Sequence, residues 1–280
     1  MKMNVLGSIY CIESIIMVIS NIFAIVIKLH LKNAEKSFYG IVLLVLFVAH
    51  LISGIFNLAI AGIIIAGTDV KNLDRRLTTS RDSVCGLEIM LTILLSLERF
   101  VAVRKPFLYE NLTKFHAKCA FGVTMLVTIA LSLLLFKTKK VYNLGYLITI
   151  LGGLFIAVSN TLLYRSAKRQ CEEISKTIVD QSEKAQTQKR NDMRKRKLKS
   201  LKICIFITAS YLLTWFPLVI VKVSKSLFDI ETDLVFIFFM VGFSNGIWDV
   251  LIYFYLNQKA RYSLLELFGI ERINVIESIL

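Results

Sequence analysis

Seven long apolar runs constrain the fold of this 280-residue chain more than any other feature. A helix rises about 1.5 Å per residue, so about 20 mostly apolar residues cross the hydrocarbon core of a bilayer. The sequence therefore predicts an all-α membrane protein, a seven-helix bundle that forms one domain over residues 1–280. The predicted spans are 5–27, 38–66, 82–103, 119–136, 142–164, 201–221 and 234–256.

The distribution of positive charge predicts how this bundle is oriented. Of the 34 Lys and Arg residues, 24 fall on the side that holds the polar segment 166–200, and 10 fall on the other side. Positive residues favour the cytoplasmic side, so the N-terminus is expected outside and 166–200 is expected to form the cytoplasmic third inner loop. A net charge of +14 would suggest nucleic acid in a soluble protein. Here the basic run borders a membrane, so the expected partner is the lipid bilayer and not nucleic acid.

The two ends of the chain carry their own signals. The first apolar run is too long for a signal peptide and contains Asn21, so it is expected to stay as a helix. In 257–280, Leu264, Leu265 and Phe268 lie near one helical face. This pattern predicts a short amphipathic eighth helix on the inner membrane surface, followed by a short tail.

The end of the third run carries the most specific motif. Glu98 and Arg99 are followed by Pro106 and Tyr109. An Arg at this depth is costly unless it faces protein or water. The stretch resembles the Asp/Glu-Arg-Tyr region and second inner loop of rhodopsin-like G-protein-coupled receptors.

Further landmarks of that family occur in the right order along the chain. Singly each is weak, but the order makes the set specific. They are Asn21 in the first span, Tyr164 in the fifth, Trp215 and Pro217 within Thr214-Trp-Phe-Pro in the sixth, Asp249 and Tyr253 in the seventh, and Asn257 and Arg261 after it.

The chain also departs from the family pattern. His50 stands where an Asp is usual, the fourth span has no Trp, and the fifth and seventh spans lack their usual prolines. The usual Cys at the outer end of the third span is missing, and its place falls near Asp74. Ala260 replaces the usual Phe of the eighth helix. The missing disulfide, the short second outer loop, the missing fifth-span proline and the Asp at the seventh-span motif resemble the melanocortin, lysolipid and cannabinoid branch.

Polar residues follow helical spacing on two of the spans, which predicts a polar seam inside the bundle. Residues three or four apart share one face, and a charged face in lipid has to point inward. In the third span these residues are Arg81, Cys85, Glu88, Thr92, Ser96 and Arg99. In the seventh they are Asn245, Asp249 and Tyr253.

His50, Glu88 and Asp249 are expected to meet, with Asn21 and Asn245, in a core polar network. Ionisable groups buried without partners each cost several kcal/mol, so mutual pairing is the cheaper arrangement. Many relatives hold sodium there. We expect a protonated His50 to take the place of that ion, and ligand affinity to respond to pH rather than to sodium. The other interpretation is a neutral, hydrogen-bonded His50.

The resemblance implies a receptor that passes an extracellular ligand signal to a heterotrimeric G protein at the plasma membrane, with no enzymatic activity, cofactor or metal. It implies ligand contacts at Arg81, Asp82, Cys85 and Trp215. It implies an activation switch and G-protein coupling surface made of Glu98, Arg99, Tyr164, Trp215, Pro217, Asp249 and Tyr253. The sixth-span region 196–199 is basic, so Glu98 is expected to hold Arg99 alone.

Two other functions stay open. One is a seven-helix chemosensory protein, or a heteromer partner, that no longer couples to G proteins; the lost prolines and disulfide favour it. The other is a small transporter, against which the lack of an internal repeat argues. Residues 234–247 contain no Lys that could bind retinal. The position where an acidic residue would bind an amine is occupied by Arg81. The ligand is therefore not expected to be a biogenic amine, and its identity stays unknown.

Overall fold

The computed structural model describes most of the apolar part of the chain. The described residues are 3–31, 38–67, 75–104, 109, 119–128, 130, 150–165, 202–203, 205–221, 224 and 232–269. The predicted third inner loop 166–200, Asp74 and the tail beyond residue 269 lie outside them.

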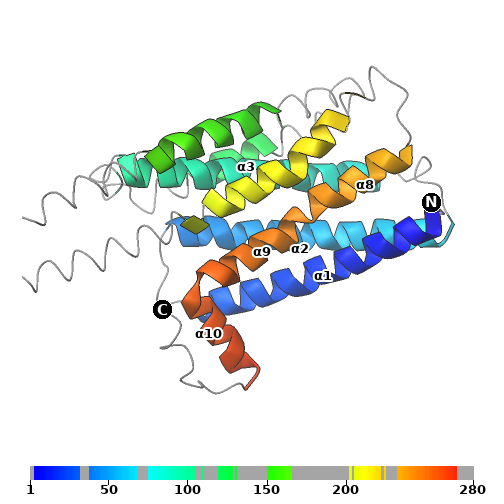
Figure 1. Cartoon of the computed structure of the whole chain (residues 1–280), viewed down its shortest axis with the longest axis horizontal. Helices are drawn as coiled ribbons and strands as arrows, with labels where there is room; N and C mark the ends of the chain where they lie inside the picture. Colours follow the sequence, from blue (N-terminus) through cyan, green and yellow to red (C-terminus); the bar gives the residue numbers. More distant parts are fainter. Residues whose placement is uncertain are drawn as a thin grey trace, which may run out of the picture.

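All regular secondary structure in these ranges is α-helical. Six helices are labelled in Figure 1: α1 (Met3–His30), α2 (Phe38–Ile65), α3 (Arg75–Arg104), α8 (Thr232–Phe243), α9 (Asn245–Leu256) and α10 (Gln258–Leu267). Three further apolar helices are Cys119–Thr128, Ile150–Arg165 and Ile205–Val221.

The lengths and composition of these helices identify a membrane-embedded helical protein. Val5–His30, Phe38–Ile65 and Leu234–Leu256 are each long and apolar enough to cross a bilayer. The three further apolar helices have 10–17 residues in their described parts. Helix α3 has 30 residues but carries charged residues along its length. The all-α membrane class is therefore confirmed, whereas seven spans remain a prediction.

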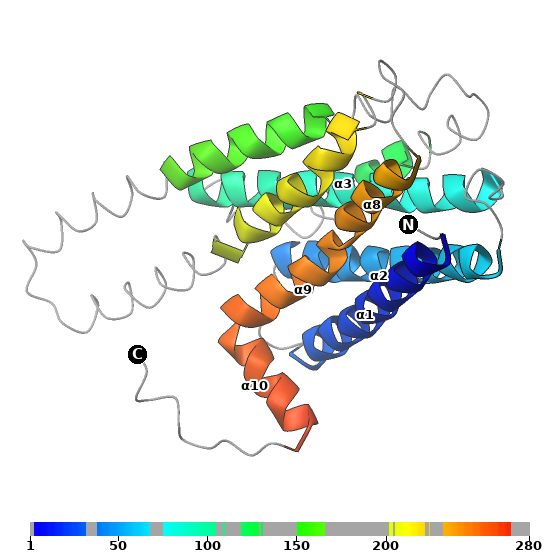
Figure 2. The same cartoon turned by 45° about the vertical axis from the view of Figure 1, so that its right-hand side comes forward.

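Helices α1, α2 and α3 run along the long axis of the molecule, and α8 and α9 cross them obliquely (Figure 1). Helix α1 packs along α2, α2 packs along α3, and α9 contacts both α1 and α2. The hydrophobic effect does not drive helices together within lipid, so their association depends on close van der Waals packing. A Cβ on Gly54 of α2 would lie 2.9 Å from Cγ2 of Val18, which shows how tightly α1 and α2 fit. Turning the molecule shows α10 leaving the direction of α9 at the end of that helix (Figure 2).

A short turn at Ser244 divides α8 from α9, where the sequence predicts one continuous span. The Ser244 amide donates to the Met240 carbonyl at 3.0 Å, and the Trp248 amide donates to the Ser244 carbonyl at 3.1 Å. The Asn21 side chain of α1 donates to the Gly246 carbonyl at 3.3 Å. Inside a membrane, a backbone carbonyl at an irregular turn needs a hydrogen-bond donor from elsewhere in the protein. Asn21 of α1 supplies such a donor next to this turn.

The buried apolar residues form two clusters at opposite ends of α3. The cluster at the Arg104 end includes Leu46, Phe47, Leu95, Ile207 and Tyr253. The cluster at the Arg75 end includes Tyr10, Cys85, Trp215, Phe236 and Phe243. The polar residues described next lie between and beside these clusters, so apolar packing fixes their positions.

Candidate functional site

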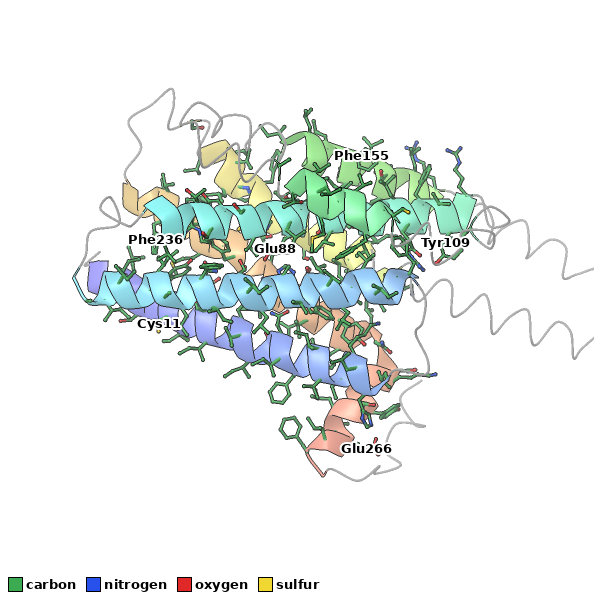
Figure 3. The ribbon with its side chains drawn as sticks, turned by 180° about the vertical axis from the view of Figure 1, so that it is seen from behind. Cys11, Glu88, Tyr109, Phe155, Phe236 and Glu266 are labelled. Atoms are coloured by element: carbon green, nitrogen blue, oxygen red, sulfur yellow. The ribbon has the colours of Figure 1, made fainter. Side chains whose placement is uncertain are left out.

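His50 on α2 lies between two carboxylates from other helices. Its Nδ1 is 3.1 Å from Oε1 of Glu88 on α3, and its Nε2 is 3.1 Å from Oδ2 of Asp249 on α9. All three residues are buried. Figure 3 shows Glu88 about halfway along α3, level with the neighbouring part of α2. The contact with Asp249 has hydrogen-bond geometry, whereas the contact with Glu88 is close but poorly aligned.

Asp249 gathers further polar partners. Oγ of Ser210, on the helix Ile205–Val221, lies 2.7 Å from Oδ1 of Asp249. Nδ2 of Asn245 donates to Oδ2 of Asp249 at 3.2 Å. Asn21 reaches the same region from α1 through its bond to the Gly246 carbonyl. The network therefore joins α1, α2, α3, α9 and the helix that carries Trp215.

Glycine at position 246 makes this meeting possible. A Cβ there would lie 2.6 Å from Cε of Met17 and 3.1 Å from Cγ of His50. The Met17 methyl group ends a flexible side chain and could move aside, but the His50 side chain would also have to shift. A larger side chain would therefore disturb the contact between α9 and α2. Removing the Cβ lets the backbone of α9 come close enough for Asp249 to reach His50.

The geometry limits where protons reside in this cluster. A neutral imidazole has one N–H, so it can donate to only one of two flanking carboxylates. The cluster is therefore satisfied either by a charged imidazolium between two carboxylates or by a neutral imidazole beside one protonated carboxyl group. Both states carry the same number of protons and a net charge of −1.

A second polar site lies at the Arg104 end of α3. Arg99 donates to both carboxylate oxygens of Glu98 through Nε and Nη2. The Tyr109 hydroxyl donates to Glu98 and lies 3.4 Å from Nη2 of Arg99. Figure 3 shows Tyr109 at this end of the bundle. The Arg99 guanidinium also lies over the ring of Tyr39 on α2, with its Cζ 4.3 Å from the ring centroid.

These contacts correct one expectation. Glu98 does not hold Arg99 alone, because Tyr39 covers a face of the guanidinium and Tyr109 bridges to its edge. The sequence could not indicate this, since Tyr39 is 60 residues earlier in the chain. Burial and the neighbouring Glu98 carboxylate raise the pKa of Tyr109 to about 12. Tyr109 therefore stays a neutral hydrogen-bond donor to Glu98 at physiological pH.

The predicted ligand contacts lie at the Arg75 end of α3. Arg81 pairs with its neighbour Asp82, with Nη2 2.8 Å from Oδ1. Its Cζ also lies 4.9 Å from the ring centroid of Phe239 and 5.2 Å from that of Phe243, both on α8. The Arg81 side chain is 9% exposed and the Asp82 side chain 30% exposed. The carboxylate is therefore the member of the pair that faces outward.

Trp215 and Cys85 are buried near this pair, in the apolar cluster at the Arg75 end of α3. The Trp215 ring meets Phe243 edge-on at 5.5 Å and stacks beside Tyr211 at 6.2 Å. Among the described residues, Nε1 of Trp215 and the Tyr211 hydroxyl are buried without a hydrogen-bond partner. Buried donors of this kind are costly unless water or a ligand satisfies them.

The remaining predicted switch residues divide into two groups. Tyr253 is buried, and its ring meets that of Phe47 edge-on with the centroids 5.3 Å apart. The Nζ atom of Lys28 lies 5.5 Å from the centroid of the Tyr253 ring. Tyr164 is 62% exposed, so its side chain does not face the buried interior where Tyr253 lies. The buried position at that helix end is Leu163, which is about 100° away around the helix. Pro217 lies within the helix Ile205–Val221, half-buried.

Sequence reasoning missed several residues of these sites. Ser210 lies four residues before Thr214, and this helical spacing could have found it. Tyr39 and Gly246 gave no comparable signal, whereas Glu13, an acidic residue within an apolar span, could have been found by its charge. Glu13 is an acidic residue within α1, with Oε1 buried and without a hydrogen-bond partner among the described residues.

Comparisons with protein-family models and with curated proteins find no match for this chain.

Proposed function

We propose that this protein is a rhodopsin-like receptor that couples an extracellular ligand to a heterotrimeric G protein. The observation that carries the proposal is the site around Arg99. The Arg99 side chain lies near one end of a long helix, where it is paired with Glu98 and contacts Tyr109 and Tyr39. If Arg99 loses these contacts, its guanidinium can bind a partner protein at the membrane surface.

The arrangement of the polar residues supports a conformational switch. The His50 network ties together helices that a ligand would have to move relative to one another. A ligand shifts such an equilibrium only by its differential affinity for the two states. The proposed ligand site lies at the Arg75 end, beside Asp82, Cys85, Trp215 and the aromatic rings that cover Arg81. The unpartnered donors of Trp215 and Tyr211 favour a ligand that carries a hydrogen-bond acceptor.

The coupling test is Arg99→Ala. We expect the variant to lose G-protein activation while surface expression stays close to that of the wild type. The assay is nucleotide exchange on a panel of purified G proteins, with Glu98→Asp as the conservative control. Normal signalling by Arg99→Ala would falsify the assignment of Arg99 to coupling.

The proposal also places the protein in the plasma membrane with the N-terminus outside. Epitope tags at residue 1 and within 166–200 test this on intact cells. We expect antibody to label the first tag without permeabilisation and the second only after it. The reverse pattern would exclude a G-protein-facing Arg99.

The alternative, a seven-helix protein that no longer couples, is decided by the same exchange assay. The burial of Arg99 favours this alternative, because an Arg99 side chain that stays paired with Glu98 and packed on Tyr39 cannot bind a G protein. Absence of exchange on every G protein, with correctly oriented protein at the cell surface, would support that alternative.

A further inference from the structure

Two of the contacts of Arg99 differ in kind and come from different parts of the chain. The carboxylate of Glu98 accepts from the edge of the guanidinium, and Glu98 is the preceding residue of α3. The ring of Tyr39 lies against the guanidinium at 4.3 Å, and Tyr39 belongs to the first turn of α2. The first contact moves with α3, whereas the second anchors Arg99 to another helix.

The position of Tyr39 is fixed by its surroundings. Its side chain is 6% exposed and belongs to the buried cluster that also contains Val42, Leu43 and Leu46 of α2. The Arg99 side chain is 11% exposed, so both partners are largely desolvated. A cation over an aromatic face is attracted more strongly when water is excluded. The contact therefore contributes to where Arg99 points.

The segment that precedes the helix Ile205–Val221 is basic in sequence, with Arg196, Lys197 and Lys199, so these residues offer no carboxylate to Arg99. Glu98 cannot fix where Arg99 points across the bundle, because it belongs to the same helix as Arg99. The ring of Tyr39 belongs to another helix, so its contact with Arg99 can do so.

We propose that Tyr39 is a positioning residue that holds Arg99 against α2 in the resting state. Arg99 has to leave the Tyr39 ring before it can reach a partner. The effect of Tyr39 on signalling rests on the proposed function, but the positioning of Arg99 by Tyr39 can be measured without any G protein.

The first experiment is a double-mutant cycle on thermal unfolding of the purified full-length protein. The variants are Tyr39→Leu, Arg99→Met and the two together. We expect Tyr39→Leu to lower the melting temperature more in the wild-type background than in the Arg99→Met background, because only the former loses a cation–π contact. Equal losses in both backgrounds overturn the inference.

The second experiment measures agonist-independent nucleotide exchange. Tyr39→Leu is expected to raise it about three- to thirtyfold, the range that the loss of a cation–π contact of ordinary strength gives. Tyr39→Phe and Tyr39→Trp keep an aromatic face and are expected to stay near the wild type. Leu46→Ala removes buried volume from the same helix and controls for general loosening; it is expected to lower stability without that rise.

The outcomes separate the inference from the proposed function. If the wild type couples but Tyr39→Leu and Tyr39→Phe have the same basal exchange, the inference is wrong and the proposed function stands. If the thermal cycle shows coupling but no variant promotes exchange on any G protein, the positioning of Arg99 stands and the proposed function fails.

Discussion

At the His50 site, one side chain meets carboxylates from two other helices, whereas at the Arg99 site the carboxylate comes from the preceding residue of the same helix. His50 and Asp249 are 199 residues apart in the chain. Glu98 and Arg99 are adjacent. Both sites bury a basic group beside an acid, but only the first depends on three helices being correctly placed.

The difference assigns different roles to the two sites. Removing a charged residue from the His50 site breaks contacts between helices and leaves a buried ionisable group without its charge partner. The Arg99 site can lose its contact with α2 and still keep Arg99 paired with Glu98. The His50 site is therefore suited to holding the bundle together, and the Arg99 site is suited to changing its contacts.

The largest expected effect is from His50→Asp. It replaces the basic member of the cluster with a third carboxylate, and each uncompensated buried ion costs several kcal/mol. We expect little folded protein, measured by surface expression and by size-exclusion chromatography in detergent. His50→Asp with Glu88→Ser removes one carboxylate again and is expected to restore folding.

The same pair of variants tests whether His50 takes the place of a sodium ion. Agonist binding to the wild type is expected to be nearly insensitive to sodium at constant ionic strength. The double variant is expected to become sodium-sensitive, because it regains an Asp at position 50. Steep sodium dependence in the wild type would contradict this interpretation of the cluster.

An intermediate effect is expected from Ser210→Ala. The Ser210 hydroxyl lies 2.7 Å from a buried Asp249 oxygen, and a hydrogen bond to a charged group contributes about 1.5–3 kcal/mol. We expect a lower melting temperature in nanodiscs. Ser244→Ala is the matched control, since the Ser244 hydroxyl, in the turn between α8 and α9, bonds only to the nearby Val241 carbonyl among the contacts described. Equal melting temperatures for the two variants would show that Ser210 does not support Asp249.

The smallest effect is expected from Tyr109→Phe, which removes a donor to Glu98 at the other site. Tyr109 is only partly buried, so solvent weakens this bond, and its loss at neutral pH is expected to cost about 0.5–1.5 kcal/mol of unfolding free energy. The folded pKa of Tyr109 is raised from 10.0 to about 12. Its contribution is therefore present below pH 10 and is lost as the pH rises toward 12.

The measurement for Tyr109 is the difference in stability between the wild type and Tyr109→Phe as a function of pH. That difference is expected to be constant from pH 7 to 9 and to shrink above pH 10. Using the difference cancels the other tyrosines and lysines that titrate in this range. A gap that stays constant to pH 11 would show that the Tyr109 hydroxyl is not coupled to Glu98.

The sequence alone determined the class of protein and the inward-facing residues of α3. Apolar runs of bilayer length leave few alternatives to membrane helices, because backbone groups in lipid have to bond within their own segment. Helical spacing likewise placed Arg81, Cys85, Glu88, Thr92 and Ser96 on one face, and all five are buried. A charged face has only one acceptable direction in a membrane.

The sequence predicted that His50, Glu88 and Asp249 meet, and the structure brings them together. The other contacts across helices were decided only by the tertiary structure. Spacing along one helix says which face is polar, but the partner depends on the rotation and depth of the neighbouring helix. Tyr39 reached Arg99, Ser210 reached Asp249, and Gly246 allowed α9 to approach His50, and none of these pairings was read from the sequence. Tyr164 had the right position in the chain, but the rotation of its helix put Leu163 inside and Tyr164 outside. An error of one residue turns a side chain by about 100°, so contacts between helices are fixed only when the whole bundle packs.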